Sequence, residues 1–257
     1  MSPLLSISDL HISVEGKQVL CGVNLSIRPG EVHVLMGPNG MGKSTLARVL
    51  SGHPAYTIDR GKIQWEGEDL SEWEIEERAH KGLFTSSQAP VEVPGVKNRQ
   101  FLYSCHLALC RARGEKPESE EQFEKKIREE MQKIGLGEEF WERQLNEGFS
   151  GGERKRNELL QLALFQPKCA LLDEIDSGLD QDAMQTISQF LRSLYEANRS
   201  FLFITHYQHF VEMLSPHYLH ILYEGKIVYS GQMEVLDILE REGFRYFASL
   251  KKPDDTL

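Results

Sequence analysis

One glycine-rich stretch limits the folds available to this chain more than any other feature. Residues 37–45 read GPNGMGKST and match the pattern G-x-x-x-x-G-K-[ST]. An apolar run at residues 31–36 precedes the stretch and a helical pattern at 46–50 follows it, so the order is strand, loop, helix. Such a loop turns backbone N–H groups toward phosphate oxygens, and the dipole of the following helix adds to the attraction. The sequence therefore predicts a phosphate-binding loop rather than a glycine turn that binds nothing.

Individual residues of this loop have distinct predicted tasks. Gly37, Gly40 and Gly42 allow the backbone to turn its N–H groups inward. Lys43 places a positive charge at the β- and γ-phosphates, and Ser44 offers a hydroxyl to Mg²⁺. The nucleotide-binding residues predicted here are Gly37, Pro38, Asn39, Gly40, Met41, Gly42, Lys43, Ser44 and Thr45.

The bulk composition excludes several classes of function. The net charge of −10 over 257 residues disfavours general attraction to nucleic acid or to anionic lipid. No apolar run approaches a membrane span, and the opening residues MSPLLS show neither a signal core nor a transit segment. We therefore expect a cytoplasmic protein with no direct membrane insertion and no nucleic-acid partner.

The four cysteines predict neither a zinc site nor a disulfide framework. Cys21, Cys105, Cys110 and Cys169 include no CxxC pair. We expect them to be reduced and buried. A role of Cys105 and Cys110 as cluster ligands is the less favoured alternative.

The hydrophobic pattern predicts an α/β fold. Residues 4–14 and 19–27 read as a β-hairpin that precedes the phosphate loop. Short apolar runs at 169–173 and 201–205 alternate with helical patterns, which predicts a parallel sheet covered on both faces. The predicted fold class is a P-loop NTPase core with an N-terminal antiparallel β-subdomain.

A change in composition near residue 88 predicts an inserted α-helical subdomain. Prolines and glycine break regular structure after this point, and residues 101–113 and 119–134 then read as helices. The second of these helices carries a single apolar face, formed by Phe123, Ile127, Met131 and Ile134. The predicted division is one domain over 4–246, with a nucleotide-binding core (1–87 and 161–246), the helical subdomain (88–160) and a polar tail (247–257).

A pair of acids forms the second candidate constellation. Asp173 and Glu174 follow a buried strand pattern, and the carboxyl ends of such strands are where open α/β sheets bind ligands. Asp173 is placed to reach Mg²⁺, usually through water, and Glu174 can orient or deprotonate the attacking water. A helix cap or a surface pair is the alternative for two adjacent acids without a phosphate loop in the same chain.

The loop at residues 149–153 reads FSGGE and resembles the LSGGQ signature of the ATP-binding cassette family, with Phe for Leu and Glu for Gln. All motifs of that family occur in its usual order. The resemblance implies an ATPase whose cofactors are ATP and Mg²⁺. It also implies that two copies face each other in the ATP state, and that one copy's P-loop meets signature residues of the other near Asp180. Those signature residues are Ser150, Gly151 and Gly152.

Two further positions take roles from the same resemblance. Gln88 is implied to link the Mg²⁺ region to the helical subdomain, and His206 to orient the γ-phosphate. An ordinary loop residue and a helix cap remain the respective alternatives. Taken together, the expected catalytic residues are Lys43, Gln88, Glu174 and His206, and the expected metal ligands are Ser44, Gln88 and Asp173.

Longer segments, 91–102, 148–161, 171–180 and 204–208, resemble the cytosolic ATPases of the SUF system for iron–sulfur cluster assembly. This resemblance implies an energy-coupling subunit whose partners are the scaffold proteins SufB and SufD. The alternative is the nucleotide-binding subunit of a membrane transporter. The hairpin turn at 14–16 has no aromatic residue to stack on adenine, a departure from many members of the wider family.

The segment from Gln88 to Leu102 predicts a partner surface. It is rich in proline and glycine, yet it carries Val91, Val93, Val96 and Phe101, an apolar set that is costly to leave in water. We expect another protein to cover some of these side chains. Packing against the helix at 101–113 within the same chain is the alternative.

Overall fold

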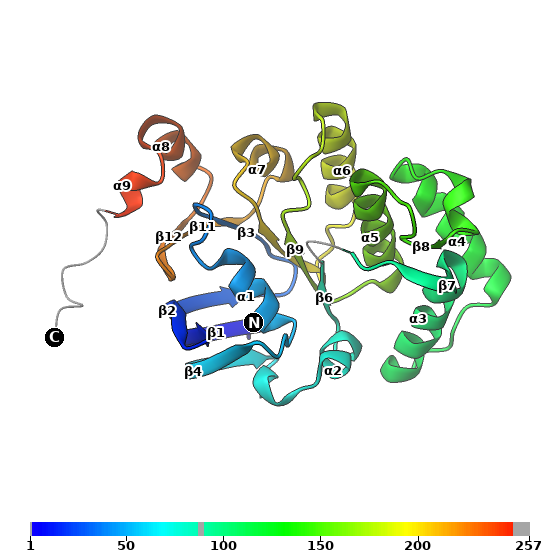
Figure 1. Ribbon diagram of the computed structural model, residues 1–257, viewed down its shortest axis with the longest axis horizontal. Coiled ribbons are helices and arrows are strands. Elements are labelled where there is room, and N and C mark those ends of the chain that lie inside the picture. The colour runs from blue at the N-terminus through cyan, green and yellow to red at the C-terminus, as the bar shows by residue number, and fades with distance from the viewer. Residues whose placement is uncertain (1, 87–89, 249–257) are drawn as a thin grey trace.

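The structure is a computed structural model that describes residues 2–86 and 90–248 (Figure 1). Gln88 lies outside the described residues. The α-helices are α1 (Lys43–Leu50), α2 (Ile75–His80), α3 (Asn98–Arg113), α4 (Glu120–Lys133), α5 (Gly151–Phe165), α6 (Gln181–Ser193), α7 (Gln208–Leu214), α8 (Val235–Glu242) and α9 (Arg245–Ala248). Short 3₁₀ turns lie at Leu70–Glu72 and Glu138–Trp141.

The strands form three sheets. The antiparallel sheet has the order β2-β1-β4-β5, the main sheet has the order β12-β11-β3-β10-β9-β6, and β7 pairs with β8 alone. Their bounds are β1 (Leu5–Val14), β2 (Lys17–Ile27), β3 (Val32–Met36), β4 (Tyr56–Trp65), β5 (Glu68–Asp69), β6 (Leu83–Thr85), β7 (Val93–Lys97), β8 (Gln144–Leu145), β9 (Cys169–Asp173), β10 (Ser200–Ile204), β11 (Tyr218–Tyr223) and β12 (Lys226–Gly231).

The main sheet is parallel except for β12, which confirms the predicted fold class. β10 lies between β3 and β9, with Ile204 opposite both Leu35 and Asp173. The carboxyl ends of these three strands therefore meet at one edge of the sheet. That edge carries the phosphate loop, the acidic pair and the residues that follow β10.

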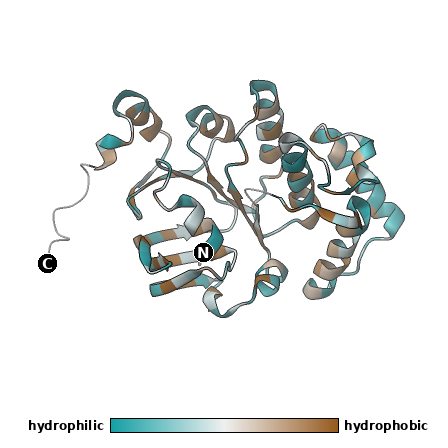
Figure 2. Ribbon diagram, in the orientation of Figure 1, coloured by the Kyte–Doolittle hydropathy of each residue, from teal (hydrophilic) through white to brown (hydrophobic). Residues whose placement is uncertain are grey.

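Side chains of β10 alternate between two hydrophobic cores. All five of its residues are buried. Phe201 and Phe203 pack with α5, α6 and α7 on one face, whereas Leu202 and Ile204 pack with α1 and the antiparallel sheet on the other. Figure 2 shows the resulting concentration of apolar residues along the central strands. A period of two in a strand buried on both faces explains why its sequence is continuously apolar.

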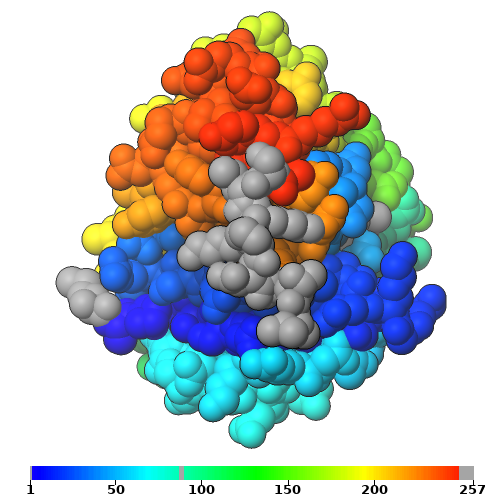
Figure 3. All heavy atoms as spheres, turned by 90° about the vertical axis from the view of Figure 1, so that its left-hand side faces the viewer, coloured from blue at the N-terminus to red at the C-terminus, as the bar shows by residue number. Residues whose placement is uncertain are grey.

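The antiparallel sheet joins the main sheet along one side of the molecule. The predicted hairpin is present as β1 and β2, and Leu5 pairs with Ile27 at its open end. Figure 3 shows this sheet, in blue to cyan, below the β11–β12 hairpin and the last helices. The Cys21 amide donates a hydrogen bond to the Gly225 carbonyl at 2.9 Å, so the hairpin at 218–231 is tied to β2.

Helices α3 and α4 lie at one end of the molecule, on the right in Figure 1. The predicted apolar face of α4 is confirmed, since Phe123, Ile127, Met131 and Ile134 are all buried. The small sheet formed by β7 and β8 and helices α7, α8 and α9 were not predicted. No helix among the described residues is long and apolar enough to cross a membrane.

Candidate functional site

A cavity of about 340 Å³ opens where the phosphate loop meets the acidic pair. It lies at the carboxyl ends of β3 and β9, the position at which parallel sheets bind ligands. Its described lining consists of Val19, Asn39, Gly40, Gly42, Lys43, Ser44, Thr45 and Glu174. The structure thus brings the two constellations predicted from sequence into one site.

Two glycines of the loop are required by close approach and backbone conformation. A Cβ at Gly37 would lie 2.2 Å from the Leu222 carbonyl oxygen. Gly42 has a φ of 102° and would place a Cβ 2.6 Å from a Leu20 methyl group. Gly42 also occupies the N-cap of α1, where no side chain caps the helix and no acid lies in the first turn. No acid in the helix's own first turn therefore competes for the amide groups that begin α1, although Glu174 lines the same cavity.

Lys43 is folded back across the loop. Its Nζ donates hydrogen bonds to the carbonyl oxygens of Gly37 at 2.8 Å and Pro38 at 2.9 Å. Burial lowers the pKa of Lys43, while the carboxylates of Glu174 and Asp173 act against that change. The ammonium group is consequently held in place beside the cavity before any phosphate arrives.

Asp173 and Ser44 supply oxygen atoms suited to a hard cation. Burial raises the pKa of Asp173, and a hydrogen bond with the Ser44 hydroxyl opposes the rise. The Asp173 Oδ1 atom is buried and has no hydrogen-bond partner among the described residues. Buried polar atoms are normally satisfied, and Mg²⁺ prefers carboxylate and hydroxyl oxygens. These residues therefore fit a magnesium ion.

Glu174 occupies an unusual backbone conformation at the cavity wall. Its φ is 51°, and its amide donates to the Ile204 carbonyl of β10 at 2.9 Å. A non-glycine residue in this region carries strain that the neighbouring strand must hold in place. His206 follows the same strand, and its Nδ1 lies 3.8 Å from Glu174 Oε1. The structure thus brings Lys43, Glu174 and His206 together.

Residues not predicted from sequence surround the acidic pair. Lys155, on α5, donates to the Glu174 carbonyl at 3.2 Å and to the Ser177 hydroxyl at 3.1 Å. Thr205 donates to Asp176 Oδ2 at 2.7 Å, and burial raises the pKa of Asp176. The only sequence signal for the hydrogen bond between Thr205 and Asp176 was that Asp176 is a third acid within the segment DEIDSGLD.

The signature residues lie apart from the cavity in the single chain. Ser150 caps α5, because its hydroxyl accepts from the Glu153 amide at 3.3 Å and Glu153 Oε2 accepts from the Ser150 amide at 2.7 Å. Asp180 caps α6 through the Ala183 amide at 2.8 Å. Figure 1 shows α5 well separated from α1. Ser150, Gly151, Gly152 and Asp180 therefore do not join Lys43 within one described chain.

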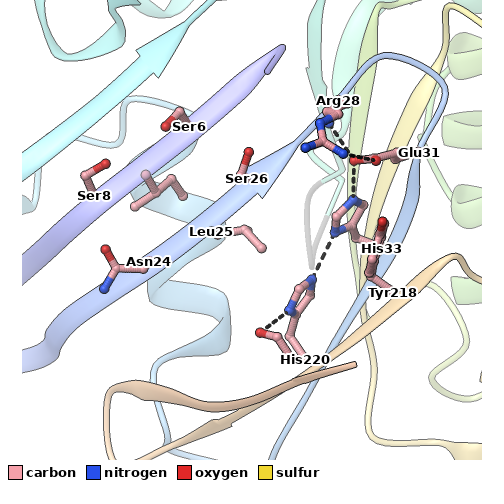
Figure 4. Close-up of a pocket in the computed structure, with 12 residues that line it drawn as sticks. Ser6, Ser8, Asn24, Leu25, Ser26, Arg28, Glu31, His33, Tyr218 and His220 are labelled. Atoms are coloured by element: carbon pink, nitrogen blue, oxygen red, sulfur yellow. Dashed lines mark hydrogen bonds and ion pairs between the residues drawn. The ribbon is translucent and has the colours of Figure 1, made fainter. Parts of the chain in front are cut away.

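A second cavity, of about 460 Å³, lies near the opposite ends of the strands (Figure 4). Several of its polar groups are paired with one another. Glu31 accepts from His33 Nε2 at 3.1 Å, the His33 and His220 rings share a 2.9 Å contact, and Ser230 lies 2.8 Å from His220 Nδ1. Burial lowers the pKa of His33 and brings that of His220 down to about 3. The chain of contacts also includes an ion pair between Arg28 and Glu31 (Figure 4). The described lining of this cavity contains neither the glycine-rich loop nor the helix N-terminus found at the first cavity.

Comparison with known proteins agrees with this geometry. The family profile described as "ABC transporter" matches residues 20–177. The chain belongs to the ATP-binding cassette family. It is an ATP-hydrolysing cassette, and the family match covers both the phosphate loop and the acidic pair.

Several relatives of the cassette cover almost its whole length. The "Probable ATP-dependent transporter SufC" of Escherichia coli (strain K12) is 43% identical over 241 residues, which span 94% of this chain and 97% of the relative. The "Iron-sulfur cluster assembly protein SufC" of Plasmodium falciparum (isolate 3D7) is 45% identical over 247 residues, or 95% of this chain and 71% of the relative.

Solved structures share the fold. The crystal structure of an ATP-binding cassette in its ADP conformation has a TM-score of 0.76 at 22% identity and covers 97% of this chain and 99% of the other. An ATP-binding subunit of an ABC transporter has a TM-score of 0.78 at 22% identity and covers 97% and 100%. At 22% sequence identity, these similarities support a shared fold and nothing further.

Proposed function

We propose that this cassette is the energy-coupling ATPase of a cytosolic SUF complex that assembles iron–sulfur clusters. The observation that carries the proposal is the 45% identity over 95% of the chain to the Plasmodium falciparum protein named for iron–sulfur cluster assembly. Its partners in this proposal are the scaffold proteins SufB and SufD. The cassette binds ATP and leaves cluster chemistry to them.

We assign the chemistry at the cavity to its own residues. Amides of the loop and the ammonium of Lys43 bind the phosphates of ATP. Glu174 orients the attacking water and accepts its proton, while His206 orients the γ-phosphate. Ser44 and Asp173 hold Mg²⁺, which when bound neutralises charge on the phosphate oxygens. We keep the proposal that Gln88 completes this set, although Gln88 lies outside the described residues.

We propose that the ATP state is a dimer with composite sites. Ser150, Gly151 and Gly152 are separated from the cavity in one chain, yet they open a helix whose first amides can bind phosphate. A second copy that faces the first would bring its signature loop to the first copy's P-loop, with Asp180 near the seam. Hydrolysis then requires both chains.

The scaffold partner is proposed to bind the segment after Gln88. The Val91 side chain is 73% exposed, and Val93 and Val96 are partly buried. Phe101 instead packs against the core of its own chain. For this residue, the structure agrees with the alternative that the apolar side chains of the segment pack within the same chain. The apolar surface left for a partner is therefore formed by the three valines.

Reconstitution with purified SufB and SufD tests the assignment. We expect the cassette to co-elute with them in gel filtration, and we expect their addition to stimulate its ATPase rate. Val96→Asp should abolish both effects while basal ATPase stays near normal, and Val96→Ala serves as the control. Unaltered ATPase and no co-elution of the native chain would refute the proposal.

The second candidate is the ATP-binding subunit of a membrane transporter. The name of the Escherichia coli relative favours it. Copurification of the native cassette with an integral membrane protein, rather than with SufB and SufD, would support this second function.

A further inference from the structure

Three buried asparagines connect helix α5, which begins after Ser150, to the segment at residues 91–97 that is proposed to bind the scaffold partner (the partner segment). Asn98 Nδ2 donates to Asn157 Oδ1 at 2.8 Å, and Asn157 Nδ2 donates to Asn146 Oδ1 at 3.0 Å. Asn146 Nδ2 donates to the Val91 carbonyl at 3.0 Å. The three side chains are at most 4% exposed. The chain of hydrogen bonds therefore runs from helix α5 to the backbone of the exposed valine.

A second contact supports the same connection from the protein surface. Arg154, three residues before Asn157 on α5, forms an ion pair with Glu92. Residues three apart share one face of a helix, so that face is connected to residues 91–92 directly through Arg154 and indirectly through Asn157 and Asn146. Exposed ion pairs contribute little by themselves. The buried amides supply the directional part of the contact, and their pairing does not depend on pH.

This arrangement determines how Ser150 can move. Ser150 caps α5, and the Arg154 amide donates to the Ser150 carbonyl at 3.0 Å within the first turn. A helix moves as a rigid element over two turns. Displacement of residues 91–92 by a partner is therefore expected to displace Ser150. Lys155 on the same helix contacts the Glu174 carbonyl of the chain's own cavity, whereas Lys43 belongs to α1 and has no contact with the three asparagines among the described residues.

We propose that Asn146 and Asn157 are positioning residues that transmit the state of the partner segment to Ser150. The inference rests on the proposed composite dimer. In that dimer, Ser150 of one chain completes the nucleotide site at the facing chain's P-loop, and that site is the one affected. The P-loop of the chain that carries this Ser150 keeps its affinity for ATP. A scaffold bound to one copy thus controls hydrolysis at the other copy's P-loop.

The backbone at Asn146 offers a selective substitution. Its φ is 60°, a conformation that Asp and Gly also tolerate. Asn146→Asp keeps the acceptor for Asn157 but replaces the donor to Val91 by an oxygen atom. Asn146→Gly keeps the backbone and removes both hydrogen bonds. Glu142→Gln is a matched control, because Glu142 pairs with Lys97 and Arg99 in the same region and not with α5.

The test mixes chains so that all activity comes from one composite site. In a mixture of Lys43→Ala and Ser150→Arg chains, only the mixed dimer joins an intact P-loop to an intact Ser150. Asn146→Asp is then added either to the Lys43→Ala chain, which supplies Ser150, or to the Ser150→Arg chain, which supplies the P-loop. Phosphate release is measured at saturating ATP, and ATP affinity is measured for each chain alone.

We expect about a tenfold loss of rate when Asn146→Asp lies on the chain that supplies Ser150, which corresponds to one lost hydrogen bond of ordinary strength. We expect a smaller loss when it lies on the chain that supplies the P-loop, where Lys155 of α5 contacts the Glu174 carbonyl. ATP affinity and the Glu142→Gln mixtures should match the unmodified ones, and Asn146→Gly should show the same dependence on chain. Equal losses on either chain, including losses caused by misfolding, would overturn the inference. Absence of activity in the starting mixture would instead refute the composite dimer.

Discussion

Replacement of Lys43 and of Glu174 should impair the cassette in different ways. The Lys43 ammonium is held beside the cavity by the loop carbonyls of Gly37 and Pro38 at 2.8 and 2.9 Å, where it is placed to donate to oxygens of the β- and γ-phosphates of ATP. Hydrogen bonds from a charged group contribute about 1.5–3 kcal/mol each, so losing one to each phosphate weakens ATP binding by about 3 kcal/mol or more. At 1.4 kcal/mol for each factor of ten, Lys43→Ala should lower ATP affinity by about 100-fold or more.

Glu174→Gln keeps the shape of the side chain and the amide bond to Ile204. It removes only the proton acceptor, so ATP affinity should stay unchanged while the rate of hydrolysis falls by about 10²–10⁴-fold. Isothermal titration with MgATP measures the affinities, and single-turnover phosphate release measures the chemical step. Equal losses of ATP affinity in the two variants would refute the roles assigned to both residues.

Three shorter predictions concern assembly and titration. Mixed Lys43→Ala and Ser150→Arg chains should recover ATPase activity that neither has alone, and no recovery would indicate a monomeric enzyme. His220 is buried with a pKa of about 3, below its unfolded value near 6.5, so its contribution to stability is present above pH 6.5 and is lost as pH falls. The free energy of unfolding measured with urea should fall by about 1.4 kcal/mol per pH unit below pH 6.5 because of this group. His220→Asn should flatten the plot of unfolding free energy against pH, and an unchanged slope in this variant would contradict the prediction. Burial raises the pKa of Cys105 to about 11 and of Cys169 to about 12, so iodoacetamide at pH 7 should leave both unmodified until the chain unfolds, as measured by mass spectrometry of peptides.

Local spacing made it predictable that the phosphate loop and the acidic pair would meet. The loop at 37–45 and the acids at 173–174 each follow a short apolar strand, and parallel strands bring such ends to one edge. Patterns of this kind are contained within about ten residues of sequence. The apolar face of α4 was predictable for the same reason, since its period is that of a helix.

Contacts between distant residues were not predictable. The bonds from Asn98 to Asn157 and from Asn146 to Val91 join residues 59 and 55 positions apart. Three separated asparagines carry no pattern, and the φ of 60° that positions Asn146 depends on its surroundings. The pairing of β7 with β8 was also missed, because it joins distant residues and because Pro94 and Gly95 suggested a break in regular structure. The division of the chain at residues 88 and 160 remains a prediction.

The chemistry of Ser150 bears on the proposal that a capping residue also binds nucleotide. Ser150 Oγ accepts from the Glu153 amide, and a hydrogen bond from the Ser150 hydroxyl also helps to lower the pKa of the Glu153 carboxyl group. In the proposed dimer, a phosphate oxygen would replace the Glu153 carboxylate as the partner of that hydroxyl. Glu153 occupies the Ser150 amide and is held there as a carboxylate, because that hydrogen bond keeps its pKa below the usual range. The amides of Gly151 and Gly152 have no partner within the helix, as expected for a first turn. In the proposed dimer, one hydroxyl and two amides at the start of α5 would form a phosphate-binding group. They do not line the described cavity of their own chain, which is the physical reason to expect the facing chain to use them.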